Sequence, residues 1–160
     1  MNQGERDTEP HEQRINRELT ELLGELRVAL PGVQMLFAFL LTVPFSARFP
    51  LLSWSQHAAF SLAFASTTVA AIFLIAPSSN HRMSFRAPDK ERLLFRSNRF
   101  AIIGIAFLAV AICAVAFFIS GMLYGDDWAP GTALATFALI FATWYLMPLL
   151  RRARRISRAS

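Results

Sequence analysis

The stretch Leu26-Arg27-Val28-Ala29-Leu30-Pro31-Gly32-Val33-Gln34-Met35-Leu36-Phe37-Ala38-Phe39-Leu40-Leu41-Thr42-Val43-Pro44-Phe45 marks the change from a charged segment to an apolar one. From Val28 to Ala47 the chain carries no charged residue for 20 positions. An α-helix needs about 20 predominantly apolar residues to cross the hydrocarbon core of a bilayer, which is roughly 30 Å thick. This stretch therefore predicts that the chain enters a membrane here.

The rest of the chain also separates charged from apolar residues. Nearly all charges lie in three blocks, residues 5–27, 82–99 and 151–158. Between the blocks lie four apolar segments, residues 28–47, 57–76, 100–123 and 129–150. Lipid offers the backbone no hydrogen-bonding partner, so such segments are expected to be helical. The predicted fold class is an all-α membrane protein with four transmembrane helices preceded by an amphipathic cytoplasmic helix.

The predicted domain organisation follows from the same segregation. We expect a disordered polar tail (1–9), an amphipathic N-terminal helix (10–30), a four-helix transmembrane domain (31–150) and a basic cytoplasmic tail (151–160). The spans are predicted at about 31–48, 57–77, 100–123 and 129–150. Residues 89–99 are predicted to form a helical lead-in to the third span, and residues 124–131 a tight turn.

The N-terminal helix is predicted from apolar residues that recur at helical spacing. These are Ile15, Leu19, Leu22, Leu23, Leu26 and Leu30. Residues 1–27 carry four Arg and seven Asp or Glu, whereas helices that lie on membranes are commonly rich in Lys and Arg. Docking on the basic central loop, or on the same helix of a second copy, is one interpretation. A helix lying flat at the interface with solvated charges is the other.

Three residues are predicted to break helices. Pro31 and Gly32 are expected to end or kink the N-terminal helix where the first span begins, and Pro44 lies near the far end of that span. The second span is rich in Ala and Ser, which allow helix backbones to approach closely, so we expect it to lie inside the bundle.

The net charge of +5 is arranged as a topology signal. Because cytoplasmic loops carry an excess of Lys and Arg, the basic central loop and tail place both termini in the cytoplasm of a multi-pass plasma-membrane protein. Anionic lipid headgroups are the expected partners, and no nucleic acid is expected. Candidate headgroup contacts are His81, Arg82, Arg86, Asn98 and Arg99. The simpler interpretation is that these charges only set the topology.

Gln34 and Thr42 are the candidate buried polar residues. The interiors of the four spans hold no Asp, Glu, Lys or Arg, which are the usual residues of an ion pathway. The Gln34 amide is expected to make a hydrogen bond between helices, and participation in a hydrated pathway is the alternative. Asp126 and Asp127 are interpreted as solvated turn residues, with cation attraction at an outer vestibule as the alternative.

Nothing in the sequence predicts an enzyme. It holds no nucleophile motif and no phosphate-binding glycine loop. Its three His residues are too scattered for a metal site, and the single Cys113 excludes an intramolecular disulfide. We therefore expect no catalytic residues, no metal and no cofactor.

Several motifs together resemble a known family. They are Glu25 to Gln34 leading into Leu36 to Phe45, then Ala76-Pro77, His81-Arg82 and Asn98-Arg99. This pattern resembles uncharacterised bacterial four-span integral membrane proteins, which are sometimes labelled sodium:proton antiporters. The resemblance implies the bacterial inner membrane and a four-span fold.

Two functional hypotheses remain open. The first is a structural or regulatory helix-bundle protein that acts through oligomerisation or a membrane partner. The second is a small sodium/proton or other ion transporter whose pathway forms between copies.

Overall fold

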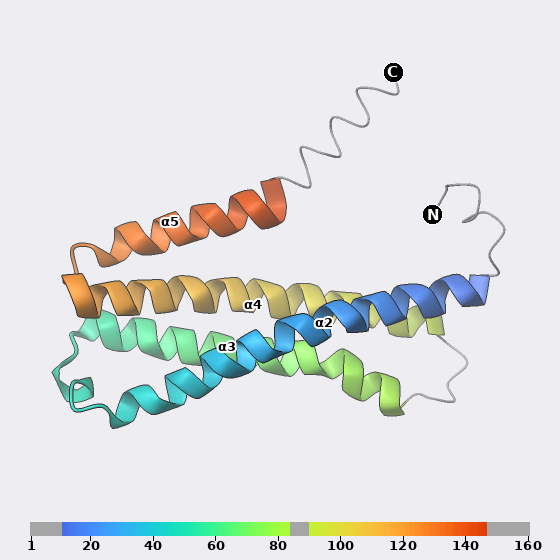
Figure 1. Ribbon diagram of the computed structural model, residues 1–160, viewed down its shortest axis with the longest axis horizontal. Helices are drawn as coiled ribbons and strands as arrows, with labels where there is room; N and C mark the ends of the chain where they lie inside the picture. Colours follow the sequence, from blue (N-terminus) through green and yellow to red (C-terminus); the bar gives the residue numbers. More distant parts are fainter. Residues whose placement is uncertain (1–10, 84–89, 147–160) are drawn as a thin grey trace, which may run out of the picture. The chain divides into compact units, whose positions relative to one another are not determined.

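The computed structural model describes residues 11–83 and 90–146, which form helices joined by short turns (Figure 1). The long helices are α2 (His11–Thr42), α3 (Trp54–Met83), α4 (Lys90–Tyr124) and α5 (Ala129–Phe141). Two short 3₁₀ helices, η1 (Val43–Phe45) and η2 (Phe49–Leu51), follow α2, and the π-helical segment η3 (Ala142–Leu146) continues α5. The all-α prediction is confirmed for these residues. The predicted tails 1–9 and 151–160 lie outside them.

Three helical segments are long and apolar enough to cross a membrane. They are Leu26–Phe45, Trp54–Ser79 and Phe95–Tyr124, and Ala129–Trp144 is a shorter apolar segment. The predicted fourth span extends to residue 150, so its last residues, 147–150, lie outside the described range. Of the three longer segments, the one in α3 has the largest buried share, 33%. Its position inside a bundle stays a prediction.

Of the two predicted effects of Pro31 and Gly32, the end of a helix is contradicted by the structure, and a kink stays a prediction. α2 runs without interruption from His11 to Thr42, with Pro31 inside it. Pro31 has no N–H and therefore cannot form the intrahelical hydrogen bond to the carbonyl of Arg27. Because lipid cannot replace backbone hydrogen bonds, an apolar helix gains more by continuing than by stopping at one defect. The predicted N-terminal helix and first span therefore form one element.

α2 ends shortly before the second proline of the stretch. Its last residue is Thr42, and Pro44 lies in η1. A residue that precedes proline is disfavoured in the α conformation, which accounts for an end at this point. The backbone then turns through η1 and η2, where the N–H of Ser46 donates to the carbonyl of Val43 at 3.0 Å.

The chain contains two compact units, which we describe separately. The first comprises Met1–Phe39 and Thr67–Phe107. Its close contact joins α3 to α4, because a Cβ atom placed on Gly104 would lie 2.7 Å from Cγ of Leu74. Nearby, the rings of Phe73 and Phe100 meet edge to face with centroids 5.6 Å apart. Because Gly104 has no side chain, α3 and α4 can approach each other closely at this position.

The second unit comprises Leu40–Ser66 and Leu108–Ser160. Its core contains Phe118 of α4, which is almost fully buried, and the ring of Phe60 lies 5.9 Å from it. Phe49 of η2 packs on Phe60 with centroids 5.3 Å apart, so the turn after α2 is anchored on α3. The core of this unit also contains four buried alanines of α3 and α4: Ala59, Ala63, Ala111 and Ala114.

Candidate functional site

A group of polar side chains joins the start of α3 to the turn between α4 and α5. We call Ser53, Ser55, Gln56 and Asp126 the Asp126 cluster. The hydroxyl of Ser55 donates to Oδ2 of Asp126 at 2.9 Å, and Nε2 of Gln56 donates to Oδ1 at 2.8 Å. Both carboxylate oxygens therefore accept hydrogen bonds from residues about 70 positions earlier in the chain.

The α3 side of the cluster is organised by a capping box. The backbone N–H of Gln56 donates to Oγ of Ser53, and the N–H of Ser53 donates to Oε1 of Gln56, both at 3.3 Å. This reciprocal pair satisfies two backbone donors at the helix start and fixes the Gln56 side chain. Its Nε2 group is thereby left free to bond Asp126. The pattern Ser-x-x-Gln at 53–56 is a signal for this helix start that is visible in the sequence.

The Asp126 side of the cluster depends on two glycines. Gly125 has φ +95°, a conformation that favours glycine, and the N–H of Trp128 donates to its carbonyl at 3.2 Å. A Cβ atom on Gly121 would lie 3.3 Å from Oδ1 of Asp126 and 3.5 Å from Cγ of Gln56. The predicted tight turn is present, and it carries Asp126 onto α3.

Hydrogen bonds to Asp126 favour its ionised form. Bonds from Ser53, Ser55 and Gln56 hold the pKa of this carboxyl below its ordinary value. The negative charge also lies beside the N-terminus of α3, where the helix dipole favours it. Within residues 11–83 and 90–146, no three His, Cys, Asp or Glu residues are grouped so that they could hold a metal ion. The cluster joins the start of α3 to the turn after α4. The interpretation of Asp126 as a solvated turn residue did not predict these hydrogen bonds to α3.

A second polar contact links α4 and α5 inside the apolar region. Oγ of Ser120 lies 2.5 Å from Oγ1 of Thr132 and 2.7 Å from the carbonyl oxygen of Ala116. Farther along α5, the hydroxyl of Thr136 donates to the carbonyl of Thr132 at 2.8 Å. These hydroxyls thus bond their own helix or the adjacent one, as is usual for Ser and Thr in apolar helices.

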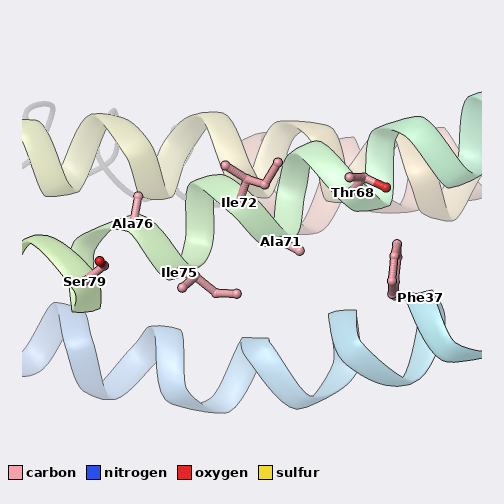
Figure 2. A pocket seen from close by; sticks show the side chains of 7 residues that line it. All are labelled: Phe37, Thr68, Ala71, Ile72, Ile75, Ala76 and Ser79. Carbon is pink, nitrogen blue, oxygen red and sulfur yellow. The ribbon is translucent and has the colours of Figure 1, made fainter.

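An apolar groove of about 460 Å³ lies in the first unit, between α2 and α3. Figure 2 shows the ring of Phe37 directed from α2 toward α3, and Ala71 and Ile75 directed from α3 toward α2. The remaining lining residues are Thr68, Ile72, Ala76 and Ser79. Only Thr68 and Ser79 bring hydroxyl groups, so the groove suits a hydrocarbon group rather than an ion.

Within the single chain, Gln34 and Thr42 are exposed on the surface of α2, and their burial against another helix stays a prediction. α2 buries Leu26 and Val33, seven residues apart, on one stripe. Gln34 follows Val33 directly and therefore lies about 100° around the helix from it. Apolar spacing identified a helix but did not show which side of it faces the protein.

The predicted headgroup residues are only partly described. Asn98 and Arg99 are exposed on α4. Residues 81 and 82 belong to α3, but the positions of the His81 and Arg82 side chains and the whole of Arg86 lie outside the described part. The contact of Leu74 with Gly104 brings residues 81 and 82 to about the level of residues 96–99. A joint headgroup contact stays a prediction.

Comparison with known proteins gives one match. No curated protein and no solved structure matches this chain. The model of a family of unknown function, DUF6328, matches residues 8–148. This range contains α2, α3, α4 and α5 in full. The chain therefore belongs to the family of unknown function DUF6328.

Proposed function

We propose that this protein is an integral membrane protein with a structural or regulatory role, which acts through helix association with a second copy or a membrane partner. The observation that carries the proposal is that polar side chains of this protein form hydrogen bonds between its helices. In the Asp126 cluster and in the Ser120–Thr132 pair, hydrogen bonds connect one helix to another. Hydrogen bonds between helices stabilise a helix bundle. The proposal includes no catalytic activity.

Aromatic residues support a membrane position for the second unit. Trp54, Tyr124 and Trp128 lie at the helix ends beside the Asp126 cluster and are 85%, 70% and 67% exposed. Trp and Tyr are enriched where a bilayer meets water, because their rings combine an apolar body with a polar group. The Asp126 cluster accordingly lies at the interface in the proposed arrangement.

Charge supports the proposed orientation. Arg96 and Arg99 are exposed near the start of α4, and the segments around residues 82–99 and 151–158 are basic. This excess favours a cytoplasmic position for the α3–α4 connection and both termini, and the family resemblance favours a bacterial inner membrane. Attraction to anionic headgroups contributes about 1 kcal/mol for each basic residue near the surface.

The alternative, a small ion transporter, requires polar groups along a pathway. The sequence places no Asp, Glu, Lys or Arg in residues 28–45, 54–79, 100–124 or 129–144. His57 lies at the start of α3, where Nδ1 is 3.2 Å from the carbonyl oxygen of Ser53 and the ring packs on Phe49 at 4.9 Å. Its contacts fit a role in packing and helix start better than a role in ion transfer.

A flux measurement tests the proposal. Purified protein in liposomes that contain a pH-sensitive dye is placed under a sodium gradient, with empty liposomes and a known antiporter as controls. We expect proton flux equal to that of empty liposomes. Sodium-dependent proton flux above that of empty liposomes would overturn the proposal in favour of the transporter alternative.

A further inference from the structure

Gln34 presents an amide near the middle of the apolar part of α2, and this amide has no partner among the residues that the structure describes. It lies eight residues after the start of the candidate span Leu26–Phe45 and eleven before its end. The side chain is exposed, and among the described residues none bonds to its amide. At this depth a bilayer offers neither water nor lipid groups that can form hydrogen bonds, so an unpaired amide is strongly disfavoured.

We propose that a second copy of this chain docks on α2 and pairs its Gln34 amide with the Gln34 amide of the first. This proposal rests on the proposed function and names the partner and the contact. A glutamine amide contains both a donor and an acceptor, so two of them related by a two-fold axis satisfy each other reciprocally. Two copies that cross the membrane in the same direction also carry Gln34 at the same depth.

The surface around Gln34 has the shape that close helix contact requires. Pro31 and Ala38 lie three residues before and four residues after Gln34, on the same face, and both are exposed. This spacing is that of the contact positions in paired helices. Both neighbours are smaller than Gln34, so two α2 helices can approach until the amides meet. We call Pro31, Gln34 and Ala38 the Gln34 face.

The Gln34 face is separate from the buried stripe of α2. Leu26 and Val33 are buried within the chain, whereas the three residues of the Gln34 face are exposed. Pairing through this face therefore requires no change in the packing of the chain itself.

The experiment measures association in a bilayer. The full chain carries a donor or acceptor fluorophore at its C-terminus, and energy transfer is followed in phosphatidylcholine liposomes as the protein-to-lipid ratio is lowered. We expect the wild type to associate and Gln34→Leu to associate about five- to thirty-fold more weakly, the range for a polar contact between membrane helices. Gln34→Asn, which retains the amide, is expected to restore part of the loss.

Matched variants separate the contact from general effects. Ala38→Ile fills the Gln34 face and is expected to weaken association as Gln34→Leu does, while helicity by circular dichroism stays unchanged. Ser61→Ala and Ala65→Ile make comparable changes at exposed positions of α3 and are expected to leave association within about two-fold of the wild type. If Gln34→Leu does not fold, Ala38→Ile still answers the question.

Two results would overturn the proposal. One is a wild type that inserts into liposomes but remains monomeric at every protein-to-lipid ratio, which would direct the search toward a different membrane protein as partner. The other is equal association of the wild type and Gln34→Leu. Failure of the protein to insert into liposomes would instead reject the proposed function, so the two failures are distinguishable.

Discussion

Asp126 shows how a single side chain can connect parts of the chain that are distant in sequence. Its two oxygens accept bonds from Ser55 and Gln56, and Gly121 leaves the room that this approach needs. The sequence placed Asp126 in a turn but did not reveal its partners. Partners of a turn residue depend on which other loop lies at the same end of the bundle, and no local pattern encodes that.

The Asp126 cluster predicts a dependence of stability on pH. Because hydrogen bonds lower the pKa of Asp126 in the folded state, the unfolded state takes up the proton at a higher pH than the folded state does. The cluster therefore stabilises the fold above the ordinary carboxyl pKa, and this contribution is lost as the pH falls through the lowered folded value. Asp126→Ala is expected to lower the thermal midpoint in micelles at pH 7 and to reduce the loss of stability in acid.

The neighbouring acid provides the control for this prediction. Asp127 lies in the same turn and is also exposed. Asp127→Ala is expected to leave the midpoint and its acid dependence close to those of the wild type. Equal effects of the two substitutions would show that the charge of the turn, rather than the bonds to α3, determines stability.

At the scale of helices, the contact between α3 and α4 depends on a glycine, Gly104, which has no side chain. In the sequence, Gly104 is a single glycine within the apolar segment 100–123. In the structure, its Cα faces Leu74, whose side chain is fully buried. A sequence pattern shows where a glycine is, but only the packing of two helices shows that its size matters.

Gly104→Ala is predicted to destabilise the protein. The added Cβ atom would lie 2.7 Å from Cγ and 3.3 Å from the backbone nitrogen of Leu74, so the helices must shift. Overpacking of this kind costs about 1–3 kcal/mol, measurable as a change in the free energy of unfolding in mixed micelles. Gly131→Ala in α5 meets no atom within 4 Å and is expected to be neutral or slightly stabilising. A loss of stability in Gly131→Ala as large as that in Gly104→Ala would contradict this account.

α2 illustrates a limit of local rules at the same scale. Proline and glycine in succession predict the end of a helix in water, where exposed backbone groups bond to solvent. Pro31 and Gly32 lie inside α2 because the apolar stretch continues well beyond them. The surrounding apolar sequence outweighs the local preference.

For the whole molecule, the number of crossings decides where the two ends lie. Residues 129–146 are described as α5 and η3, and 18 helical residues reach about 27 Å, close to the hydrocarbon thickness. If this segment crosses, the chain makes an even number of crossings and both termini lie on one side. Reporter fusions at residues 1 and 160 are expected to indicate the cytoplasm. A fusion at Arg48, between α2 and α3, is expected to indicate the opposite side. Fusions at the two termini that report opposite sides would show that α5 does not cross.

The sequence by itself determined the class of this protein. The separation of charged from apolar residues and the length of the apolar segments predict helices that can cross a membrane, because a helix satisfies the backbone hydrogen bonds within its own segment where lipid offers no partner. Helix starts and turns, such as those at residues 90 and 124–131, could be predicted for the same local reason.

Only the tertiary structure decided which side chains meet. The contacts of Asp126 with α3, of Ser120 with Thr132 and of Gly104 with Leu74 arise from the way helices pack, and packing depends on shapes that are far apart in the sequence. It also decided that Gln34 lies on the exposed side of α2, where it has no partner within residues 11–83 and 90–146 as far as their side chains are described. Helical periodicity is the same for either side, so the direction in which Gln34 faces required the neighbours of α2 to be in place.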